Sequence, residues 1–346
     1  MAGGAGTRFW PLSTSQRPKQ FLRLVDDESL LQKSFRRLEG LIDSDRILVL
    51  TNQAFVPLVQ EQLPKIPPEN IVGEPLRRDT AAAVCLAALL VRKRFGNSII
   101  ATVTADHLIE PIDLFQKSLM SAVRGALSSG ALYTFGIYPT YAATGYGYLE
   151  LGEELFREDG IKHFRIASFQ EKPEPLVAQE YLASGRHFWN SGMFVWSTGA
   201  ILRELEANLL LHLERLSVSI ESFGTSSWNQ SLTDALYPLD AVSIDYAVME
   251  KAHEVCCVAS PFSWTDIGGW LALLPFLEKD GNDNAYRGRI STLDARRNLV
   301  YCDDDSEEVL LVGLEELVVV RAEGRTLIVP RDRLEEIKSA VASLKK

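Results

Sequence analysis

Cysteine is scarce in this sequence, with four residues in 346. Cys85, Cys256, Cys257 and Cys302 show neither a C-x-x-C pair nor the spacing of a disulfide framework. This pattern excludes a disulfide-stapled secreted scaffold and the common cysteine metal sites. It predicts buried, unpaired thiols in a reducing cytoplasm.

Long apolar runs are also missing. Ala81–Val91 and Val309–Val320 are shorter than the roughly 20 uninterrupted residues of a membrane helix or carry charges. The chain opens with glycine and charge where a signal peptide needs an apolar region, so we expect no leader and no membrane partner.

Positive charge is not in excess, since 36 basic side chains face 46 acidic ones and give a net charge of −10. A broad surface for nucleic acid or anionic lipid is therefore excluded. Any phosphate chemistry has to be done by a few placed cations. The five histidines show no metal-ligand spacing.

What the sequence does contain is an alternation of apolar strands and helices. Strands are predicted at Arg46–Thr51, Ser98–Thr104 (buried) and Ala131–Tyr138, with helices at Asp79–Phe95 and Asp113–Leu127. This alternation predicts an α/β fold with a doubly wound, mainly parallel, Rossmann-like sheet. In such sheets, ligands bind at the carboxyl ends of the strands.

The pattern changes after the turn-rich segment Gly281–Asn284. Five short strands are expected, followed by a closing helix at Asp332–Lys345. The expected strands are Arg287–Asp294, Asn298–Tyr301, Val309–Gly313, Leu317–Arg321 and Arg325–Val329. We therefore predict a catalytic domain over residues 1–280 and a small β-rich domain over residues 285–346.

The glycine-rich opening, Gly3–Arg8, reads GGAGTR. Glycines let backbone N–H groups approach phosphates, and Arg8 adds charge. Phe9 stands where G-x-G-x-x-G needs its last glycine, and no Gly-Lys-Ser/Thr follows, so this is neither the dinucleotide fingerprint nor a Walker A loop. Taken alone, the segment is a phosphate loop or a plain turn.

The segments that follow decide in favour of phosphate chemistry. Together they resemble the sugar-1-phosphate nucleotidylyltransferases, specifically the mannose-1-phosphate guanylyltransferases. The resemblance rests on Gly3–Arg8, Trp10–Leu12, Pro18–Phe21, Glu74–Ala81, Ala105–His107, Thr144–Tyr148, Phe169–Pro173, Trp189–Phe194, Ser243–Tyr246 and Trp264–Trp270. It is dense over residues 1–270 and loose beyond them.

The resemblance implies transfer of GMP from GTP to α-D-mannose 1-phosphate, giving GDP-mannose and pyrophosphate, with Mg²⁺ as cofactor. Two alternatives stay open: transfer with another hexose 1-phosphate or nucleotide, and a non-catalytic regulator that binds sugar nucleotide. Family members usually carry an apolar strand before the glycine loop, whereas this sequence opens at Met1. Either that strand is shortened or the start lies upstream.

Residue roles for the phosphates and the metal follow from the resemblance. Arg8 and Lys19 would clamp the departing pyrophosphate, and Asp106 and Asp266 would hold Mg²⁺, which prefers hard oxygen ligands. Outside these motifs, a surface lysine and two capping aspartates would be the simpler interpretation. The loop would cradle the nucleotide phosphates through Gly3, Gly4, Gly6 and Thr7.

Glu74 is the candidate for the base, because a carboxylate accepts from both adjacent donors on one edge of guanine. An exposed glutamate before a helix is the alternative. Arg78, Asp79 and Thr80 would shape the base and ribose pocket.

For the hexose, Gly147 would permit close approach, Glu171 and Asn190 would bind hydroxyls, and Lys172 would face the sugar phosphate. The expected assembly is a homodimer through the C-terminal domain, with each active site formed within one chain.

Overall fold

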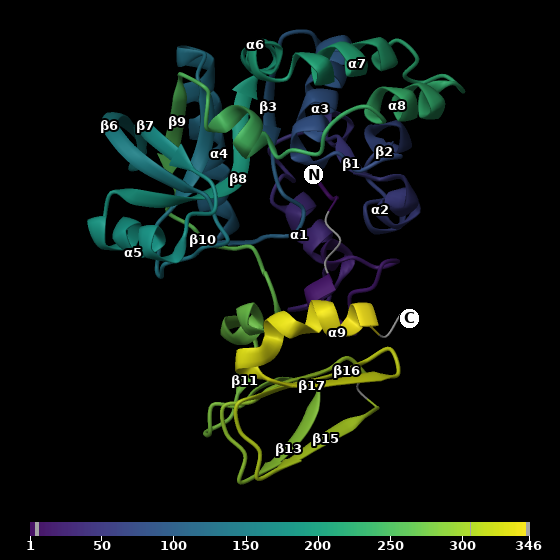
Figure 1. Cartoon of the computed structure of the whole chain (residues 1–346), viewed down its shortest axis with the longest axis vertical. Coiled ribbons are helices and arrows are strands. Elements are labelled where there is room, and N and C mark those ends of the chain that lie inside the picture. The colour runs from purple at the N-terminus through teal and green to yellow at the C-terminus, as the bar shows by residue number, and fades with distance from the viewer. Residues whose placement is uncertain (4–6, 305, 344–346) are drawn as a thin grey trace. The chain divides into compact units, whose positions relative to one another are not determined.

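The structure is a computed structural model that describes residues 1–3, 7–304 and 306–343. The chain forms two compact units (Figure 1). Unit 1 contains Met1–Gly3, Phe35–Thr104 and Ile109–Trp264, and unit 2 contains Gly4–Ser34, Ala105–Leu108 and Thr265–Lys346. These units are defined by packing, and their limits differ from the predicted domain boundary near residue 280. That boundary stays a prediction.

Unit 1 is built on a six-stranded sheet with the strand order β3-β8-β5-β9-β7-β6. Its strands are β3 (Ile99–Thr102), β5 (Leu132–Ile137), β6 (Tyr148–Glu158), β7 (Ile161–Gln170), β8 (His187–Ser197) and β9 (Val255–Ala259). Two further strands, β1 (Val49–Asn52) and β2 (Ile71–Glu74), pair in parallel as a separate sheet.

The predicted α/β class is confirmed, but the six-stranded sheet is mixed rather than mainly parallel. Among its described pairings, β5 with β9 is parallel and the others are antiparallel. The cause is the long strand β8, which runs between β3 and β5 in the opposite direction, together with the hairpin of β6 and β7. Alternation of strands and helices in the sequence cannot reveal such a reversed strand.

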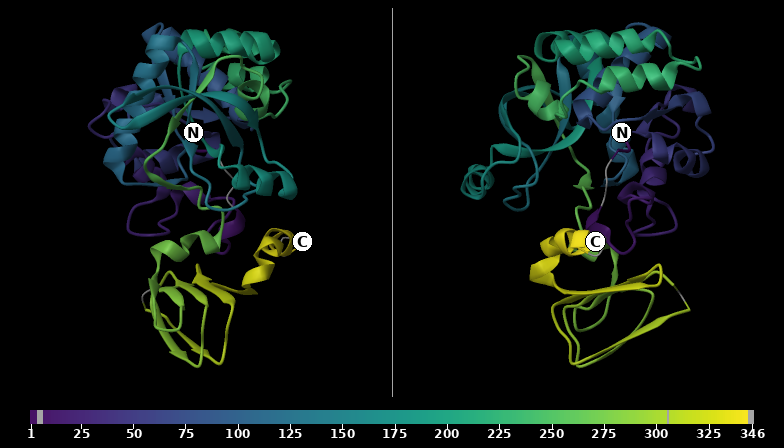
Figure 2. Two further views of the ribbon diagram at one scale, coloured as in Figure 1. Left: turned by 90° about the vertical axis from the view of Figure 1, so that its left-hand side faces the viewer. Right: turned by 45° about the vertical axis from the view of Figure 1, so that its right-hand side comes forward.

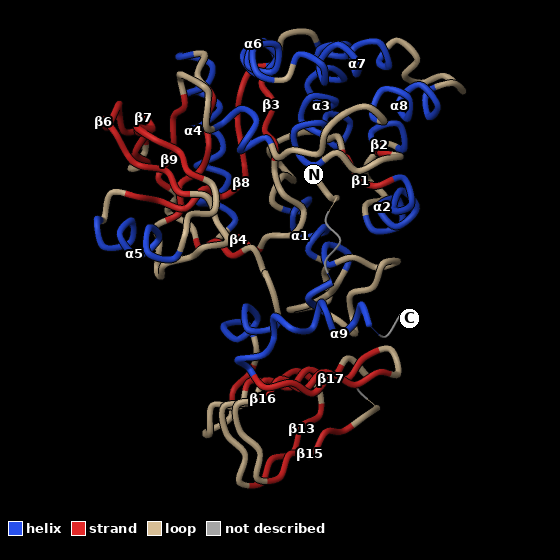
Figure 3. The backbone as a smooth tube through the Cα atoms, viewed as in Figure 1, coloured by secondary structure: helices blue, strands red, loops and turns tan. Residues whose placement is uncertain are grey.

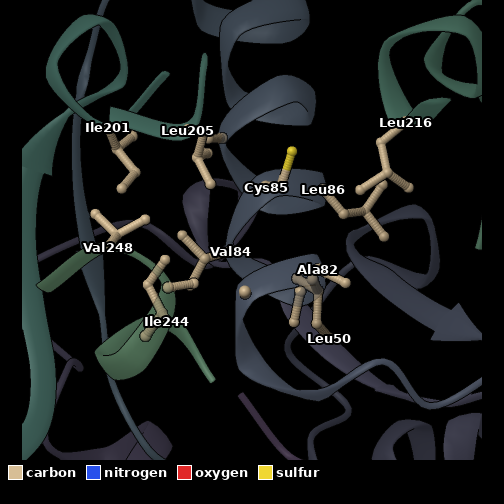
Figure 4. Close-up of a cluster of buried hydrophobic side chains, with 14 of the residues drawn as sticks. Leu50, Ala82, Val84, Cys85, Leu86, Ile201, Leu205, Leu216, Ile244 and Val248 are labelled. Atoms are coloured by element: carbon tan, nitrogen blue, oxygen red, sulfur yellow. The ribbon is translucent and has the colours of Figure 1, made fainter. Parts of the chain in front are cut away.

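Helix α3 (Asp79–Phe95) is the centre of the main core of unit 1 and has the predicted bounds. Helices α6 (Thr198–Asn208) and α7 (Leu210–Ile220) pack against it, and α8 (Trp228–Leu236) packs against α7 (Figures 1 and 2). Figure 4 shows Leu86 of α3 near Leu216 of α7, within the same cluster of buried side chains. Since α3 is buried on nearly every side, its first turn is held firmly in place.

A second core of unit 1 lies under α4 (Ile112–Ser129). In this core, the ring centroids of Phe115 of α4 and Phe135 of β5 are 6.5 Å apart. The smaller helices of unit 1 are α2 (Val56–Gln62), α5 (Pro175–Ser184) and the π-helical turn η6 (Asp245–Met249). The 3₁₀ turns in the first part of the chain include η2 (Lys19–Phe21), η3 (Ser44–Arg46), η4 (Gln53–Phe55) and η5 (Pro68–Asn70).

Strand β3 departs from the sequence prediction of a buried strand. Ala101 is exposed, and Ile99 and Ile100 are half-buried. One edge of β3 pairs with β8, whereas its other edge borders a cavity of about 350 Å³ that Leu48 and Leu50 also line. The strand is therefore apolar, as the sequence indicates, but is incompletely covered.

Unit 2 combines an irregular opening with a coil of short strands. Strands β12 (Ala285–Arg287), β14 (Leu299–Cys302) and β16 (Leu317–Ala322) stack in parallel, and β13 (Arg289–Leu293) and β15 (Glu308–Val312) form a second parallel pair. Figure 3 labels β13, β15 and β16 among the strands of this region. Strand β17 (Arg325–Pro330) pairs antiparallel with β16, and β11 (Glu278–Lys279) with β12. The predicted small β-rich region is confirmed, while its parallel winding was not foreseen.

The rest of unit 2 packs on this coil. Phe9 and Leu22 share a buried cluster with Trp270, Tyr301 and Val318. The chain closes with η8 (Arg331–Glu336) and α9 (Ile337–Ser343), where the closing helix is predicted. The elements of the whole chain that have not yet been named are η1 (Thr7–Phe9), α1 (Leu30–Arg36), β4 (Leu108–Glu110), β10 (Ser263–Thr265) and η7 (Trp270–Phe276).

All four cysteines are free and buried, as predicted. Within the described residues, the helices are too short or too polar to cross a membrane.

Candidate active site

Lys19 lies at the centre of the predicted phosphate and metal residues of unit 2. Its ammonium nitrogen is 2.9 Å from a carboxylate oxygen of Asp106 and 2.6 Å from the backbone oxygen of Asp266. The Lys19 side chain is only 12% exposed, and that of Asp106 is 31% exposed. The structure therefore brings together three residues that lie far apart in the sequence.

Apolar anchors fix the two loops that meet here. Next to Lys19, Gln20 and Phe21 are fully buried, so the short turn η2 cannot move freely. On the other loop Ile267 is buried, and the indole nitrogen of Trp270 donates to the backbone oxygen of Trp10 at 3.3 Å. The site residues are thus carried by backbone that the core of unit 2 holds.

Arg8 belongs to the same group. Its guanidinium donates to the backbone oxygen of Gly268 at 3.3 Å, and the side chain is exposed. An exposed arginine held at one end keeps most of its five donors available to an anion. Arg8 and Lys19 therefore both contact the backbone of the segment Asp266–Gly268. Their role at the departing pyrophosphate stays a prediction.

The electrostatic balance keeps Asp106 ionised. Burial raises the pKa of Asp106, but the charges of Lys19 and His107 and the hydrogen bond from Lys19 outweigh it and hold the pKa below its ordinary value. An ionised carboxylate is the form that binds a divalent cation.

The donor set fits Mg²⁺ in its chemistry. Asp106 and Asp266 offer hard carboxylate oxygens, and Gly268 leaves space beside the Asp266 carboxylate, since an added Cβ would lie 3.3 Å from its oxygens. The described residues contain no group of three or more candidate ligands. A magnesium ion that takes phosphate oxygens and waters needs only one or two protein carboxylates.

The glycine loop is only partly described. Gly4 and Gly6 lie outside the described residues, as does the side chain of Thr7, whose backbone begins η1. Gly3 is exposed, and an added Cβ there would meet no atom within 4 Å. The predicted phosphate cradle stays a prediction.

Glu74 ends β2 in unit 1, at the carboxyl end of a parallel pair. Burial raises the pKa of Glu74 to about 7, against the opposing effects of the terminal amine and Arg77. A buried carboxylate is costly unless hydrogen-bond donors satisfy it, and a bound base could supply such donors to Glu74.

The residues that follow Glu74 make more hydrogen bonds within the protein. The guanidinium of Arg78 donates to the backbone oxygens of Leu236 and Tyr237, both at 2.8 Å, so it holds the end of α8. The hydroxyl of Thr80 accepts from the backbone N–H of Ile244 at 2.9 Å. Asp79 is exposed at the first position of α3. Arg78 and Thr80 thus have structural contacts in addition to their predicted roles.

The predicted hexose residues lie together in unit 1. Glu171 is 9% exposed, and its carboxylate contacts the Lys172 ammonium at 3.1 Å. A Cβ on Gly147 would lie 2.4 Å from a carboxylate oxygen of Glu171 and 3.4 Å from Asn190, so a side chain at this position would displace the Glu171 carboxylate. The Asn190 backbone N–H donates to Gly147 at 2.8 Å.

Comparison with known proteins identifies the family. The family model for nucleotidyl transferases matches residues 1–282, and one for the MannoseP isomerase/GMP-like beta-helix domain matches residues 288–344. The chain belongs to the nucleotidyl transferase family. The parallel coil of unit 2 agrees with the second match.

Individual relatives of this nucleotidyl transferase show which members of the family it is similar to. Mannose-1-phosphate guanylyltransferase of Salmonella montevideo is 36% identical over 350 residues, covering 100% of this chain and 73% of the relative. Xanthan biosynthesis protein XanB of Xanthomonas campestris is 35% identical, covering 100% of this chain and 72% of the relative. The predicted resemblance to mannose-1-phosphate guanylyltransferases is confirmed.

A solved structure is similar to the whole of this chain. The crystal structure of mannose-1-phosphate geranyltransferase from Thermus thermophilus matches with a TM-score of 0.87 and 32% identity, covering 100% of this chain and 98% of that one.

One residue of this nucleotidyl transferase was given no role from the sequence. Asp245 accepts a hydrogen bond from the side-chain amide of Asn190 at 2.8 Å. The segment Ser243–Tyr246 contributes to the resemblance, but nothing in its spacing places Asp245 beside a residue 55 positions earlier. The sequence feature that could have drawn attention to Asp245 is that its carboxylate lies inside a family motif but has no assigned partner.

Proposed function

We propose that this chain transfers GMP from GTP to α-D-mannose 1-phosphate, giving GDP-mannose and pyrophosphate. The observation that carries the proposal is that Lys19 contacts the carboxylate of Asp106 and the backbone oxygen of Asp266, so that one cation joins two residues whose side chains are of the kind that hold Mg²⁺. Full-length similarity to named guanylyltransferases agrees with it.

The phosphate groups would be met by unit 2. Arg8 and Lys19 would bind the β- and γ-phosphates, and Asp106 and Asp266 would hold Mg²⁺. A bound Mg²⁺ would supply neutralisation of the negative charge on the phosphates. Since phosphoryl-type transfers gain most of their rate from positioning and charge stabilisation, these residues need no covalent role.

The guanine base would be bound by Glu74 in unit 1. Guanine presents two adjacent N–H donors, which favour the ionised carboxylate. Such donors would replace the hydration that burial takes from Glu74.

The hexose would be bound by Gly147, Glu171 and Asn190, with Lys172 directed to the sugar phosphate. Glu171 and Lys172 form an ion pair, and Lys172 is 55% exposed, so its ammonium remains accessible to an incoming phosphate. The Glu171 backbone N–H donates to Glu250 at 2.9 Å, which fixes the main chain at this point.

A homodimer through the C-terminal region completes the proposal, together with a cytoplasmic location. Support for the dimer comes from exposed apolar side chains on β13 and β15, where Leu293, Leu310 and Val312 are 58%, 64% and 54% exposed. Clustered exposed apolar residues are typical of interaction surfaces.

The deciding experiment is a pyrophosphate-release assay with the four nucleoside triphosphates and several hexose 1-phosphates, with products identified by mass spectrometry. We expect GTP and mannose 1-phosphate to be preferred. Another preferred pair would favour the alternative nucleotidylyltransferase, and binding of GDP-mannose without turnover would favour the regulator.

The role of Glu74 is tested in the same assay with Glu74→Gln. The amide places a donor against a guanine donor, which costs roughly 1–3 kcal/mol. The preference for GTP over ATP should fall about ten- to hundredfold. If the preference is unchanged, guanine is bound elsewhere.

A further inference from the structure

The side-chain amide of Asn190 is held at both ends within unit 1. Its nitrogen donates to Asp245 at 2.8 Å, and the hydroxyl of Thr134 lies 2.7 Å from its oxygen. Asn190 and Thr134 are buried on the neighbouring strands β8 and β5. The amide is therefore a fixed group rather than a mobile surface side chain.

Counting donors and acceptors shows what this amide still offers. A carboxamide has two N–H donors and two oxygen lone pairs. Asp245 takes one N–H and Thr134 occupies one lone pair, which leaves one donor and one acceptor for a ligand. Which side of the amide presents the donor depends on how the amide is turned.

Thr134 cannot decide that orientation alone. Its hydroxyl has one hydrogen and lies within reach of both the Asn190 oxygen and the backbone oxygen of Met193, at 2.7 and 3.0 Å. If the hydroxyl donated to Met193, its oxygen could accept from a turned amide. An ionised Asp245 accepts only, so it selects the orientation that points nitrogen toward it.

Asp245 is itself carried by well-held backbone. It begins the π-helical turn η6, and π-helical turns are often found at functional sites. Two hydrogen bonds tie the preceding residues to the first turn of α3. The Ile244 N–H donates to Thr80 at 2.9 Å, and the Ala81 N–H donates to Val242 at 3.1 Å.

We propose that Asp245 is a positioning residue of the hexose site: its carboxylate fixes the Asn190 amide so that the remaining donor and acceptor meet hydroxyls of the hexose 1-phosphate. The inference rests on the proposed function, because it takes Asn190 as part of the hexose site. Asp245 acts through Asn190 and does not touch the sugar.

The surroundings of Asp245 make its charge sensitive to pH. Burial raises the pKa of Asp245 to about 7, and the charge of Glu171 adds to this, while the Asn190 hydrogen bond and Lys172 oppose it. Two other titratable groups lie near Asp245. Glu250 accepts a hydrogen bond from the Glu171 backbone N–H, and Tyr246 follows Asp245 in η6. Once protonated, Asp245 becomes a donor and no longer favours the same amide orientation.

The kinetic test uses Asp245→Asn. We expect KM for mannose 1-phosphate to rise about ten- to hundredfold, while KM for GTP stays within about twofold. The matched control is Asp240→Asn, which removes an exposed carboxylate earlier in the same segment and should change neither constant. A thermal midpoint near that of the unchanged protein shows that the variant folds.

A double-mutant cycle separates positioning from direct contact. In an Asn190→Ala background, Asp245→Asn should add no further rise in KM, because the group through which it acts is gone. A rise that multiplies with that of Asn190→Ala would mean that Asp245 binds the sugar itself, and would overturn the proposal. An unchanged KM in the single variant would also overturn it.

A spectroscopic test does not depend on turnover. The side-chain amide resonances of Asn190 should shift with a midpoint near pH 7 in the unchanged protein and should not titrate in Asp245→Asn. Resonances that ignore pH, or that titrate equally in both proteins, refute the positioning role. If the unchanged protein makes no sugar nucleotide while these resonances behave as expected, the proposed function fails and the positioning of Asn190 stands.

Discussion

The ammonium of Lys19 lies 2.9 Å from the carboxylate of Asp106, and this ion pair joins two predicted site residues that are 87 positions apart (106 − 19). Removing the Asp106 carboxylate therefore takes away a proposed metal ligand and the ion-pair partner of a largely buried lysine together. Asp266 contributes to the same group through its backbone oxygen, which a side-chain substitution leaves in place.

The first prediction concerns metal dependence. Asp106→Asn and Asp266→Asn should each lower turnover by roughly two or more orders of magnitude, because an amide oxygen is a weaker ligand for Mg²⁺ than a carboxylate. Chelation with EDTA should abolish turnover in the unchanged protein, and added Mg²⁺ should restore it. Asp332→Asn, in an exposed part of unit 2, is the control. Near-normal turnover of either site variant at saturating Mg²⁺ would contradict the assignment for that residue.

The second prediction concerns pH and stability at Glu74. Burial raises its pKa from 4.5 to about 7 in the folded state, so the folded protein holds a proton that the unfolded chain has lost over this window. The contribution of Glu74 to stability therefore falls as pH rises from about 4.5 to about 7. Glu74→Gln lacks this loss, so its free energy of unfolding should rise by about 3 kcal/mol relative to that of the unchanged protein between roughly pH 4.5 and pH 8. Urea unfolding of both proteins at these two pH values measures the difference, and an equal pH dependence in both would contradict it.

The third prediction concerns the stacked asparagines of unit 2. The amide of Asn298 donates to Asn284 at 2.9 Å and to the Leu314 backbone at 2.8 Å, and it accepts from the Leu317 N–H at 3.0 Å. Asn298 is fully buried, so Asn298→Ala removes the side-chain acceptor of the Leu317 N–H and one of the two donors to the Leu314 oxygen, which keeps the Arg296 N–H. We expect a loss of about 3 kcal/mol in the free energy of unfolding. The exposed Asn282→Ala should change it by less than about 0.5 kcal/mol.

This stacking also shows where sequence reasoning stops. Local patterns predict strands β13 to β17 of the tail, because apolar residues alternate with turns, but they do not predict β11 or a separate β12. They do not say that strands stack in parallel, since that depends on residues about one coil apart. Asn284 and Asn298, each followed by an apolar residue, are the repeated signal, but two copies are too few to recognise as a period.

The candidate site shows the same division. Lys19, Asp106 and Asp266 could be chosen because each stands in a recognisable motif, and the structure brings them together. Asp245 could not be given a role, because that role depends on its contact with Asn190, which only the folded sheet provides. By contrast, the bounds of α3 were predictable, since its 17 residues contain no glycine or proline and Gly96 follows.

The fourth prediction concerns the cavity beside β3. The Ala2 N–H donates to the Leu50 oxygen at 2.9 Å, and the Met1 amine donates to the Val103 oxygen at 2.8 Å, so this backbone runs between β1 and β3 toward the cavity. Five added residues of alternating valine and isoleucine before Met1 would enter this space as an extended strand. Burial of two such side chains should stabilise the protein by about 3 kcal/mol. An equally long serine-rich addition is the control, and equal thermal midpoints for both would contradict the prediction.

The last prediction concerns assembly. Deleting the chain beyond Gly281 would be a poor test of the dimer, because Tyr301 and Val318 share a buried cluster with Phe9 and Leu22. Single charges on the exposed face of β15 leave that cluster intact. Leu310→Asp and Val312→Asp together should weaken self-association roughly a hundredfold or more, since a charge opposes burial of an apolar contact. Leu127→Asp, on an equally exposed leucine of α4, is the matched control. Light scattering should show a monomer for the double variant and a dimer for the control, with sugar-nucleotide synthesis retained in both, because each active site is expected to lie within one chain. A double variant of unchanged mass would place the interface elsewhere, and a monomer without activity would show that the sites depend on the partner.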